Sequence, residues 1–232
     1  MFFFLTSKEI HMIPKKILSC AFAVLISLSV YGSEYKFNFV MHSDTNNAFW
    51  AAVYKGFMDA CKQVDADCQM LTLTGDGDQQ EQLQNFESSI AQGVDGIITT
   101  ITNPTIFDKA VDEALSKGIP VITANTDDPE GAAGSNRLAY VGQDLEAAGY
   151  ELAATLSKQI PSGDVHVLIG AADMNQSWAY TRGNGIARFM EDYKSANPSR
   201  KITYEKIESG LDLSTVGNRV AAYVQANPNT TA

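Results

Sequence analysis

The chain has few of the residues that catalytic and metal sites need. Its 232 residues include three histidines and three cysteines, and it holds no G-x-S-x-G, H-E-x-x-H, P-loop or C-x-x-C motif. His42 and His166 are the only histidines beyond residue 33, which is too sparse for a metal site, and His166 falls within a strand pattern. No nucleophile, base and orienting residue can be assembled. The sequence therefore predicts a protein that is not an enzyme and that carries neither cofactor nor metal.

Positive charge is scarce as well. The chain has 17 Lys and Arg against 27 Asp and Glu, which gives a formal net charge of -10. Nucleic-acid binders normally present a basic face, so we expect no nucleic-acid partner. Hydrophobic residues make up 45% of the chain, enough for one large domain or two small ones.

The one long apolar run covers residues 17–30 and indicates an export signal. Lys15 and Lys16 precede the run, and side chains of small or moderate size follow at residues 30–32, as at the cleavage site of a secretory signal peptide. A membrane anchor is the alternative, but the run is shorter than the roughly 20 residues that span a bilayer. A lipoprotein signal at Cys20 would leave too short an apolar region. We expect residues 1–32 to be an upstream extension and a signal peptide cleaved near Gly32.

If residues 1–32 are removed on export, two cysteines remain in the mature chain, Cys61 and Cys68. They lie on either side of a short turn between a predicted helix and a predicted strand. In an oxidising compartment this arrangement predicts a disulfide, which would stabilise the fold by roughly 2–3 kcal/mol. Two buried free thiols are the alternative, because the sequence does not show whether the geometry permits a bridge. A metal pair is disfavoured, since no other Cys or His is nearby.

Strand and helix patterns alternate along the rest of the chain. Strand patterns occur at residues 35–42, 68–74, 94–101, 119–124, 138–142, 165–169 and 202–207, with amphipathic helices between them. The first helix is predicted to bury one apolar face, formed by Phe49, Val53, Phe57, Cys61 and Val64. This order implies βαβ units, and hence parallel sheets covered by helices on both faces.

The pattern divides the chain into two α/β halves, residues 33–142 and residues 143–232. The second half has only two clear strands after residue 142. The chain stops at residues 229–232, where the alternation of strands and helices predicts another apolar strand. The sequence thus predicts two doubly wound, Rossmann-like parallel-sheet lobes, the second of them incomplete.

A glycine-containing turn at residues 75–80 follows one strand and opens a helix. It resembles a dinucleotide-binding turn, but residue 80 is Gln in place of the third glycine. Asp76 and Asp78 would also place negative charge where a pyrophosphate must lie. A helix start capped by Asp78, with Glu81 three residues later, explains the segment better.

Polar and aromatic side chains gather where predicted strands end. His42, Asn46, Asn47 and Asn125 fall at the carboxyl ends of parallel strands, the edge where such sheets bind ligands. Amides pair with hydroxyl groups, and aromatic faces cover apolar C–H patches, so these residues together with Phe49 and Trp50 favour a saccharide. Alternatively, Phe49 and Trp50 are core residues and Asn125 caps its strand.

A second group of candidates lies further along the chain. Arg182 offers a rigid fork of donors that suits vicinal hydroxyls or a carboxylate, although a lone arginine is also a common surface residue. Asn175 and Trp178, in and just after a polar loop at residues 172–177, are weaker candidates, as are His42 and Asn46.

Six segments in this order resemble the periplasmic sugar-binding proteins of ABC importers, in the ribose-binding-protein-like group with the type I periplasmic binding protein fold. They are residues 46–50, 75–78, 92–98, 118–123, 140–142 and 182–186. The resemblance implies two lobes that close over one sugar. It implies ligand contacts at Asn47, Phe49, Trp50, Asn125 and Arg182.

The resemblance also implies a function. We expect a periplasmic protein that captures a neutral monosaccharide or polyol and delivers it to the membrane permease of an ABC importer. The alternatives are a sensing domain that presents the sugar to a chemoreceptor or sensor kinase, and a non-functional fragment. Ribose binders have an acidic residue and an arginine where this chain has Asn125 and Thr126, which disfavours ribose itself. Family members also continue well beyond the point that matches residue 232.

Overall fold

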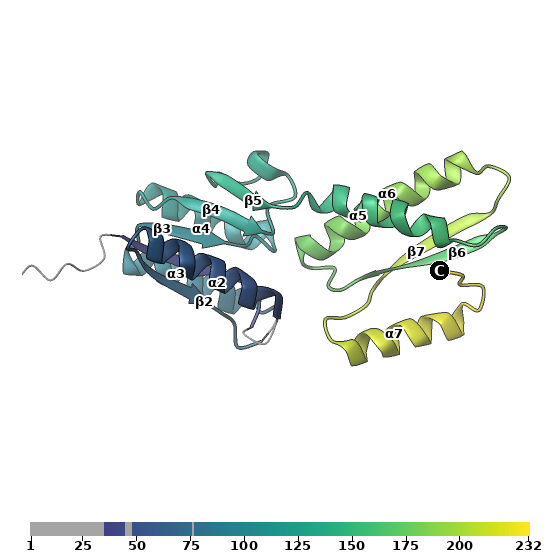
Figure 1. The fold of residues 1–232 in the computed structure, drawn as a ribbon, viewed down its shortest axis with the longest axis horizontal. Helices are drawn as coiled ribbons and strands as arrows, with labels where there is room; N and C mark the ends of the chain where they lie inside the picture. The colour runs from purple at the N-terminus through teal and green to yellow at the C-terminus, as the bar shows by residue number, and fades with distance from the viewer. Residues whose placement is uncertain (1–34, 45–47, 76) are drawn as a thin grey trace, which may run out of the picture. The chain divides into compact units, whose positions relative to one another are not determined.

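The computed structural model describes residues 35–44, 48–75 and 77–232 (Figure 1). Residues 35–232 form one compact unit. The predicted signal peptide and the candidates Asn46 and Asn47 lie outside the described residues. Among the described helices, none has the length and hydropathy of a membrane-spanning segment.

Five parallel strands form the first sheet, in the spatial order β2-β1-β3-β4-β5. Each neighbouring pair is parallel, which confirms the predicted α/β class. The chain winds outward from β1 in one direction to β2 and in the other to β3, so the switch point of the sheet lies between β1 and β3. The strands are β1 (Lys36–Val40), β2 (Asp67–Leu71), β3 (Gly96–Thr99), β4 (Val121–Asn125) and β5 (Ala139–Gly142).

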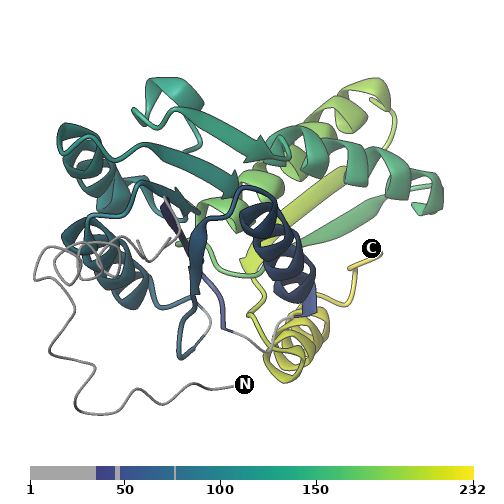
Figure 2. The ribbon, with the colours of Figure 1, turned by 60° about the vertical axis from the view of Figure 1, so that its left-hand side comes forward.

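Three helices cover the two faces of this sheet (Figure 2). On one face, α3 (Gln79–Gln92) and α4 (Pro104–Ser116) bury Phe86 and Phe107 against Val40 and Ile97 of the strands. On the other face, α2 (Ala48–Gln63) packs against the side chains that alternate with these along β1 and β3.

The apolar face predicted for α2 is wrong at both ends. Phe49 and Val64 are 55% and 61% exposed, whereas Trp50 and Cys61 are buried. The true face runs through Trp50, Val53, Phe57 and Cys61, because the Trp50 ring packs edge-on against Phe39 of the sheet. The Phe49 ring is therefore left outside the core.

Asp78 caps α3 as predicted, since its side chain accepts hydrogen bonds from the Gln80 and Glu81 backbone N–H groups. Glu81 does not complete a reciprocal capping box. Its carboxylate instead accepts from the backbone N–H and the hydroxyl of Thr74, both at 2.9 Å. These bonds fix the turn between β2 and α3.

Two parallel strands, β6 (Val165–Ala171) and β7 (Ile202–Glu208), form the second sheet. Residues 230–232 run alongside the free edge of β6, where Leu168 N–H donates to the Ala232 carbonyl at 2.7 Å. Three helices accompany this sheet: α5 (Leu145–Leu156), α6 (Ser177–Ala196) and α7 (Leu213–Ala226). The boundary expected between residues 142 and 143 falls in the link from β5 to α5.

The helices of the second sheet differ in how well they are packed. α5 and α6 cross closely, and Met190 of α6 is buried against Val165, Ile169 and Ile202 of the strands. In contrast, α7 has no fully buried residue, and its Leu213 is 92% exposed. The apolar side chains of α7 therefore contribute little to the core of this part.

The predicted disulfide between Cys61 and Cys68 is present. It joins the last turn of α2 to β2, with a Cα–Cα distance of 6.2 Å across a sequence separation of 7.

Candidate functional site

The carboxyl ends of β1, β3 and β4 bring three polar residues to the same edge of the first sheet. His42 follows β1, Thr100 follows β3, and Asn125 is the last residue of β4. His42 Nδ1 lies 2.9 Å from Thr100 Oγ1, so a hydrogen bond joins the two strand ends at the switch point. This bond sets the orientation of the imidazole ring.

A buried glutamine supports this pair from behind. Gln82 of α3 is fully buried, and its Nε2 donates to the backbone carbonyl and the hydroxyl of Thr100, both at 2.8 Å. Its Oε1 accepts from the Thr102 hydroxyl at 3.2 Å. The side-chain amide thus has partners at both ends and holds the end of β3 in place.

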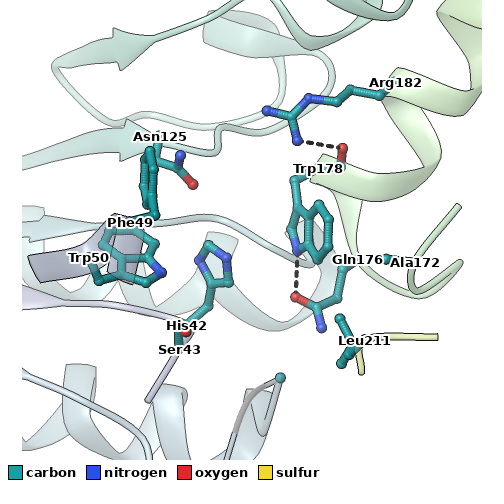
Figure 3. Close-up of a pocket in the computed structure, with 11 residues that line it drawn as sticks. His42, Ser43, Phe49, Trp50, Asn125, Ala172, Gln176, Trp178, Arg182 and Leu211 are labelled. Carbon is teal, nitrogen blue, oxygen red and sulfur yellow. Dashed lines mark hydrogen bonds between the residues drawn. The ribbon is translucent and has the colours of Figure 1, made fainter. Parts of the chain in front are cut away.

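A cavity of about 310 Å³ opens at this edge (Figure 3). Its volume falls at the lower end of the range for small-molecule sites. Side chains from both sheets line it, and they share a position beyond the carboxyl end of a strand or in the first turns of a helix: His42, Ser43, Phe49, Trp50, Gly77, Asn125, Ala172, Gln176, Trp178, Arg182 and Leu211.

Aromatic rings form the walls of the cavity. The His42 ring lies nearly parallel to the Trp178 ring, at a centroid distance of 6.2 Å, and meets Trp50 edge-on at 5.3 Å. Phe49 meets Trp50 edge-on at 5.2 Å, with its own ring exposed. Trp178 Nε1 donates to Gln176 Oε1 at 2.7 Å, which fixes the orientation of the indole. These rings present flat apolar faces in defined positions.

The first turn of α6 is anchored to the first sheet by Ser177. This residue is fully buried; its backbone N–H donates to the Thr102 carbonyl at 2.7 Å, and its hydroxyl donates to the Ile101 carbonyl at 2.8 Å. Trp178 and Arg182 follow on α6 at a spacing of four residues, so both project from the same side of the helix. The anchor therefore positions both cavity-lining side chains.

Arg182 and Asn125 lie at one end of the cavity (Figure 3). Burial lowers the pKa of Arg182, and its Nη1 donates to the Trp178 carbonyl at 3.5 Å. Asn125 adopts a left-handed backbone conformation with φ of 64°, which Asn tolerates better than most residues. The Tyr140 hydroxyl lies 2.9 Å from the Asn125 carbonyl and 2.8 Å from the Gln143 carbonyl, and burial raises the pKa of Tyr140.

The loop after β4 is held by an ion pair. Arg137 donates through Nε and Nη2 to the two carboxylate oxygens of Asp127, and both side chains are about one-tenth exposed. Thr123 also donates to Asp127, at 2.7 Å. Next to this pair, burial raises the pKa of Asp128 and of Asp108. The loop thus keeps Asp127 paired, whereas Asp128 of the loop and Asp108 of α4 lie in an environment that disfavours their charge.

Most of the sequence-predicted candidates that the structure describes come together around the cavity. Phe49, Trp50, Asn125 and Arg182 line it, as do the weaker candidates His42 and Trp178. Asn175 does not line it. Its side chain is exposed, and its carbonyl accepts from Gln79 at 3.3 Å. Asn46 and Asn47 lie outside the described residues.

The sequence analysis missed five lining residues: Ser43, Gly77, Ala172, Gln176 and Leu211. Ala172 and Leu211 follow β6 and β7, so the rule that ligands bind beyond the carboxyl ends of parallel strands points to both. Gly77 belongs to the turn interpreted as a helix start. It adopts φ of 82°, and a Cβ there would lie 2.7 Å from Gln176 Nε2. The positive φ favours glycine at this position, and a larger residue would also displace the Gln176 side chain.

Within residues 35–44, 48–75 and 77–232, no group of three His, Cys, Asp or Glu side chains is placed to hold a metal ion. The cavity offers aromatic faces, amides, one imidazole and one guanidinium. Such a set can hold a small polar molecule by stacking and by hydrogen bonds.

Comparison with known proteins identifies the family to which the chain belongs. The periplasmic binding protein domain family matches residues 37–232, nearly all of the described chain. The chain therefore belongs to this family, and its fold is that of the type I periplasmic binding proteins.

Among curated relatives, the chain is 29% identical over 201 residues to the xylose/arabinose-binding protein XylF of Sulfolobus acidocaldarius, which covers 84% of this chain. The match spans 47% of that protein, about half of its length.

Two solved structures are similar as well. The periplasmic sugar-binding protein of an ABC sugar transporter from Legionella pneumophila has a TM-score of 0.75 and 26% identity, and the match covers 85% of this chain and 68% of that one. The XylFII molecule has a TM-score of 0.70 and 26% identity, with 84% and 68% covered. The chain thus shares the fold of proteins whose names describe sugar binding.

Proposed function

We propose that this protein captures a monosaccharide or polyol in the cavity described above and delivers it to the membrane permease of an ABC importer. The parts around the first and second sheets, residues 33–142 and 143–232, would act as the two lobes that hold the sugar. Capture would take place in the periplasm, after removal of the signal peptide. The protein would change no bond in its ligand.

The observation that carries this proposal is the composition of the cavity wall. Phe49, Trp50 and Trp178 supply ring faces for the C–H surface of a sugar, and Asn125 and Arg182 supply groups that bind hydroxyl oxygens. Saccharides need both kinds of contact on one small surface. The match to a xylose/arabinose-binding protein supports the same ligand class.

A sensing role is the second candidate. One solved neighbour with this fold is a complex of XylFII with LytSN, so a protein of this fold is found bound to a second protein. In such a role the ligand site would be the same, and the occupied protein would be presented to a chemoreceptor or sensor kinase. Capture of the protein by a permease or by a receptor domain, with and without sugar, separates the two roles.

Isothermal calorimetry tests the ligand class. We expect the exported chain to bind at least one member of a panel of pentoses, hexoses and polyols with saturable heat and no turnover. Phe49→Ala should weaken that binding about tenfold or more, a loss of about 1.4 kcal/mol, because the ring is exposed and available to a ligand.

Tyr54→Ala is the matched control for this substitution. Tyr54 is also an exposed aromatic residue of α2, at 49% exposure, but it does not line the cavity. Its replacement should leave affinity unchanged. The proposal is wrong if no sugar binds, if any sugar is converted to product, or if both substitutions have the same effect.

A further inference from the structure

The charge of the cavity is unbalanced. Among its described lining residues, Arg182 is the one Arg or Lys, and none is Asp or Glu. The ion pairs of the described residues do not include Arg182. Its guanidinium is thus a positive charge at the cavity wall that no carboxylate of the described residues pairs with.

Arg182 is also partly removed from water, which is why its pKa is lowered. A partly buried charge without a partner is unfavourable, and a hydrogen-bonded counter-charge relieves that cost. The carboxylate of Asp127, in the loop after β4, is engaged by Arg137, which binds both of its oxygens. Among the described residues, no carboxylate forms an ion pair with Arg182.

The other polar groups around Arg182 do not offer a strong acceptor. At this end of the cavity the Asn125 side-chain oxygen accepts from the Thr126 hydroxyl at 3.0 Å, and at the opposite end the Gln176 side-chain oxygen accepts from Trp178 (Figure 3). The Tyr140 hydroxyl lies against two backbone carbonyls, to which it serves as donor. The described residues that line this end of the cavity thus offer Arg182 neutral acceptors and no carboxylate.

We propose that the preferred ligand is a sugar acid, such as a hexuronate or an aldonate, in place of the neutral sugar that the sequence analysis expects. Its carboxylate would accept two parallel hydrogen bonds from the Arg182 fork, the geometry that guanidinium and carboxylate groups favour. Its carbon skeleton would lie against the rings of Phe49, Trp50 and Trp178. Figure 3 shows Arg182 above these rings, so one small molecule can reach both. This inference rests on the proposed function and narrows its ligand class.

Matched ligand pairs test the inference by calorimetry at pH 7. The pairs are D-galacturonate with D-galactose, D-glucuronate with D-glucose, and D-xylonate with D-xylose; the methyl ester of galacturonate supplies the acid shape without the charge. We expect at least one acid to bind tenfold or more tightly than both its neutral parent and, for galacturonate, the ester. This preference should fall as salt is raised, because the interaction is between charges.

Substitutions then assign the preference to Arg182. In Arg182→Gln the ratio of acid to neutral affinity should fall toward one, and in Arg182→Lys, which keeps the charge, part of the ratio should remain. Arg188→Gln is the matched control on the same helix, since Arg188 is exposed and pairs with Glu146 at 3.1 Å, away from the cavity. It should leave the ratio unchanged. Far-UV circular dichroism confirms that each variant is folded.

The outcomes separate this inference from the proposed function. If neutral sugars bind as tightly as their acids, or if Arg182→Gln keeps the full ratio, the sugar-acid inference is overturned and sugar capture stands. If neither acids nor neutral sugars bind to the folded protein, both are overturned.

Discussion

Replacing Gly185 by alanine tests how closely α5 and α6 must approach to hold the cavity wall in place. A Cβ atom at Gly185 would lie 2.0 Å from the Glu146 carbonyl oxygen and 2.9 Å from the Tyr150 backbone nitrogen. Since carbon–oxygen contacts are normally about 3.3 Å or longer, the helices would have to separate by roughly 1 Å. The obstructing atoms belong to the backbone, so no side-chain rotation relieves the clash.

Two opposing contributions determine how much Gly185→Ala changes the free energy of unfolding. Overpacking of this kind costs about 1–3 kcal/mol, and a backbone clash belongs at the upper end of that range. Alanine is favoured over glycine inside a helix by about 0.5–1 kcal/mol, which offsets part of the cost. We expect Gly185→Ala to lower the free energy of unfolding by about 2 kcal/mol and the Tm by about 4–8 °C. Urea denaturation and thermal unfolding, both followed by circular dichroism, measure these quantities.

Gly56→Ala is the matched control, because nothing lies within 4 Å of a Cβ at that position of α2. This substitution should raise the free energy of unfolding by about 0.5–1 kcal/mol. Gly149→Ala, whose Cβ would lie 2.0 Å from the Arg182 carbonyl oxygen, should destabilise and also weaken ligand binding. If Gly185→Ala is as stable as Gly56→Ala, the close helix crossing described here is wrong.

Three further predictions concern stability. Reduction of the Cys61–Cys68 disulfide should lower the free energy of unfolding by about 2–3 kcal/mol in urea denaturation, and an unchanged midpoint would contradict a structural role. Asp108→Asn should stabilise the protein at pH 7 by about 1 kcal/mol or less, since one buried Asp108 oxygen has no partner and burial, with Asp128 nearby, raises its pKa. The penalty exists only while Asp108 is charged, so this gain in Tm should shrink as the pH falls toward 3.8, and a pH-independent gain would refute the reasoning. Amide hydrogen exchange should be fastest in α7 and slowest in α3 and α4, because α7 has no buried residue; equal protection would contradict this packing.

The alternation of strands and helices was predictable because burial on both sides makes parallel strands continuously apolar. The sequence predicted all seven strands that the structure describes, but not their spatial order in the first sheet. It did not predict which of two adjacent aromatic residues enters the core. Phe49 and Trp50 are both apolar at the start of α2, and only the contact between Trp50 and Phe39 decides that Trp50 is buried and Phe49 is exposed.

The candidate site was predictable only in part. His42 and Asn125 follow directly from the strand patterns and from the ligand-binding edge of parallel sheets. Gln176 was missed because its role depends on bonds that no pattern encodes: it accepts from Trp178 and donates to Asp173 at 3.0 Å. The position of Trp178 in turn depends on the anchoring of Ser177 to a carbonyl 75 residues earlier in the chain, at Thr102.

The most direct test of sugar capture uses the intrinsic fluorescence of the protein. The chain has two tryptophans, Trp50 and Trp178, and both line the cavity, so a ligand that enters it must change the emission. We predict a saturable change on titration with a monosaccharide, polyol or sugar acid. A flat titration with every member of the panel, from protein shown by circular dichroism to be folded, would contradict the account.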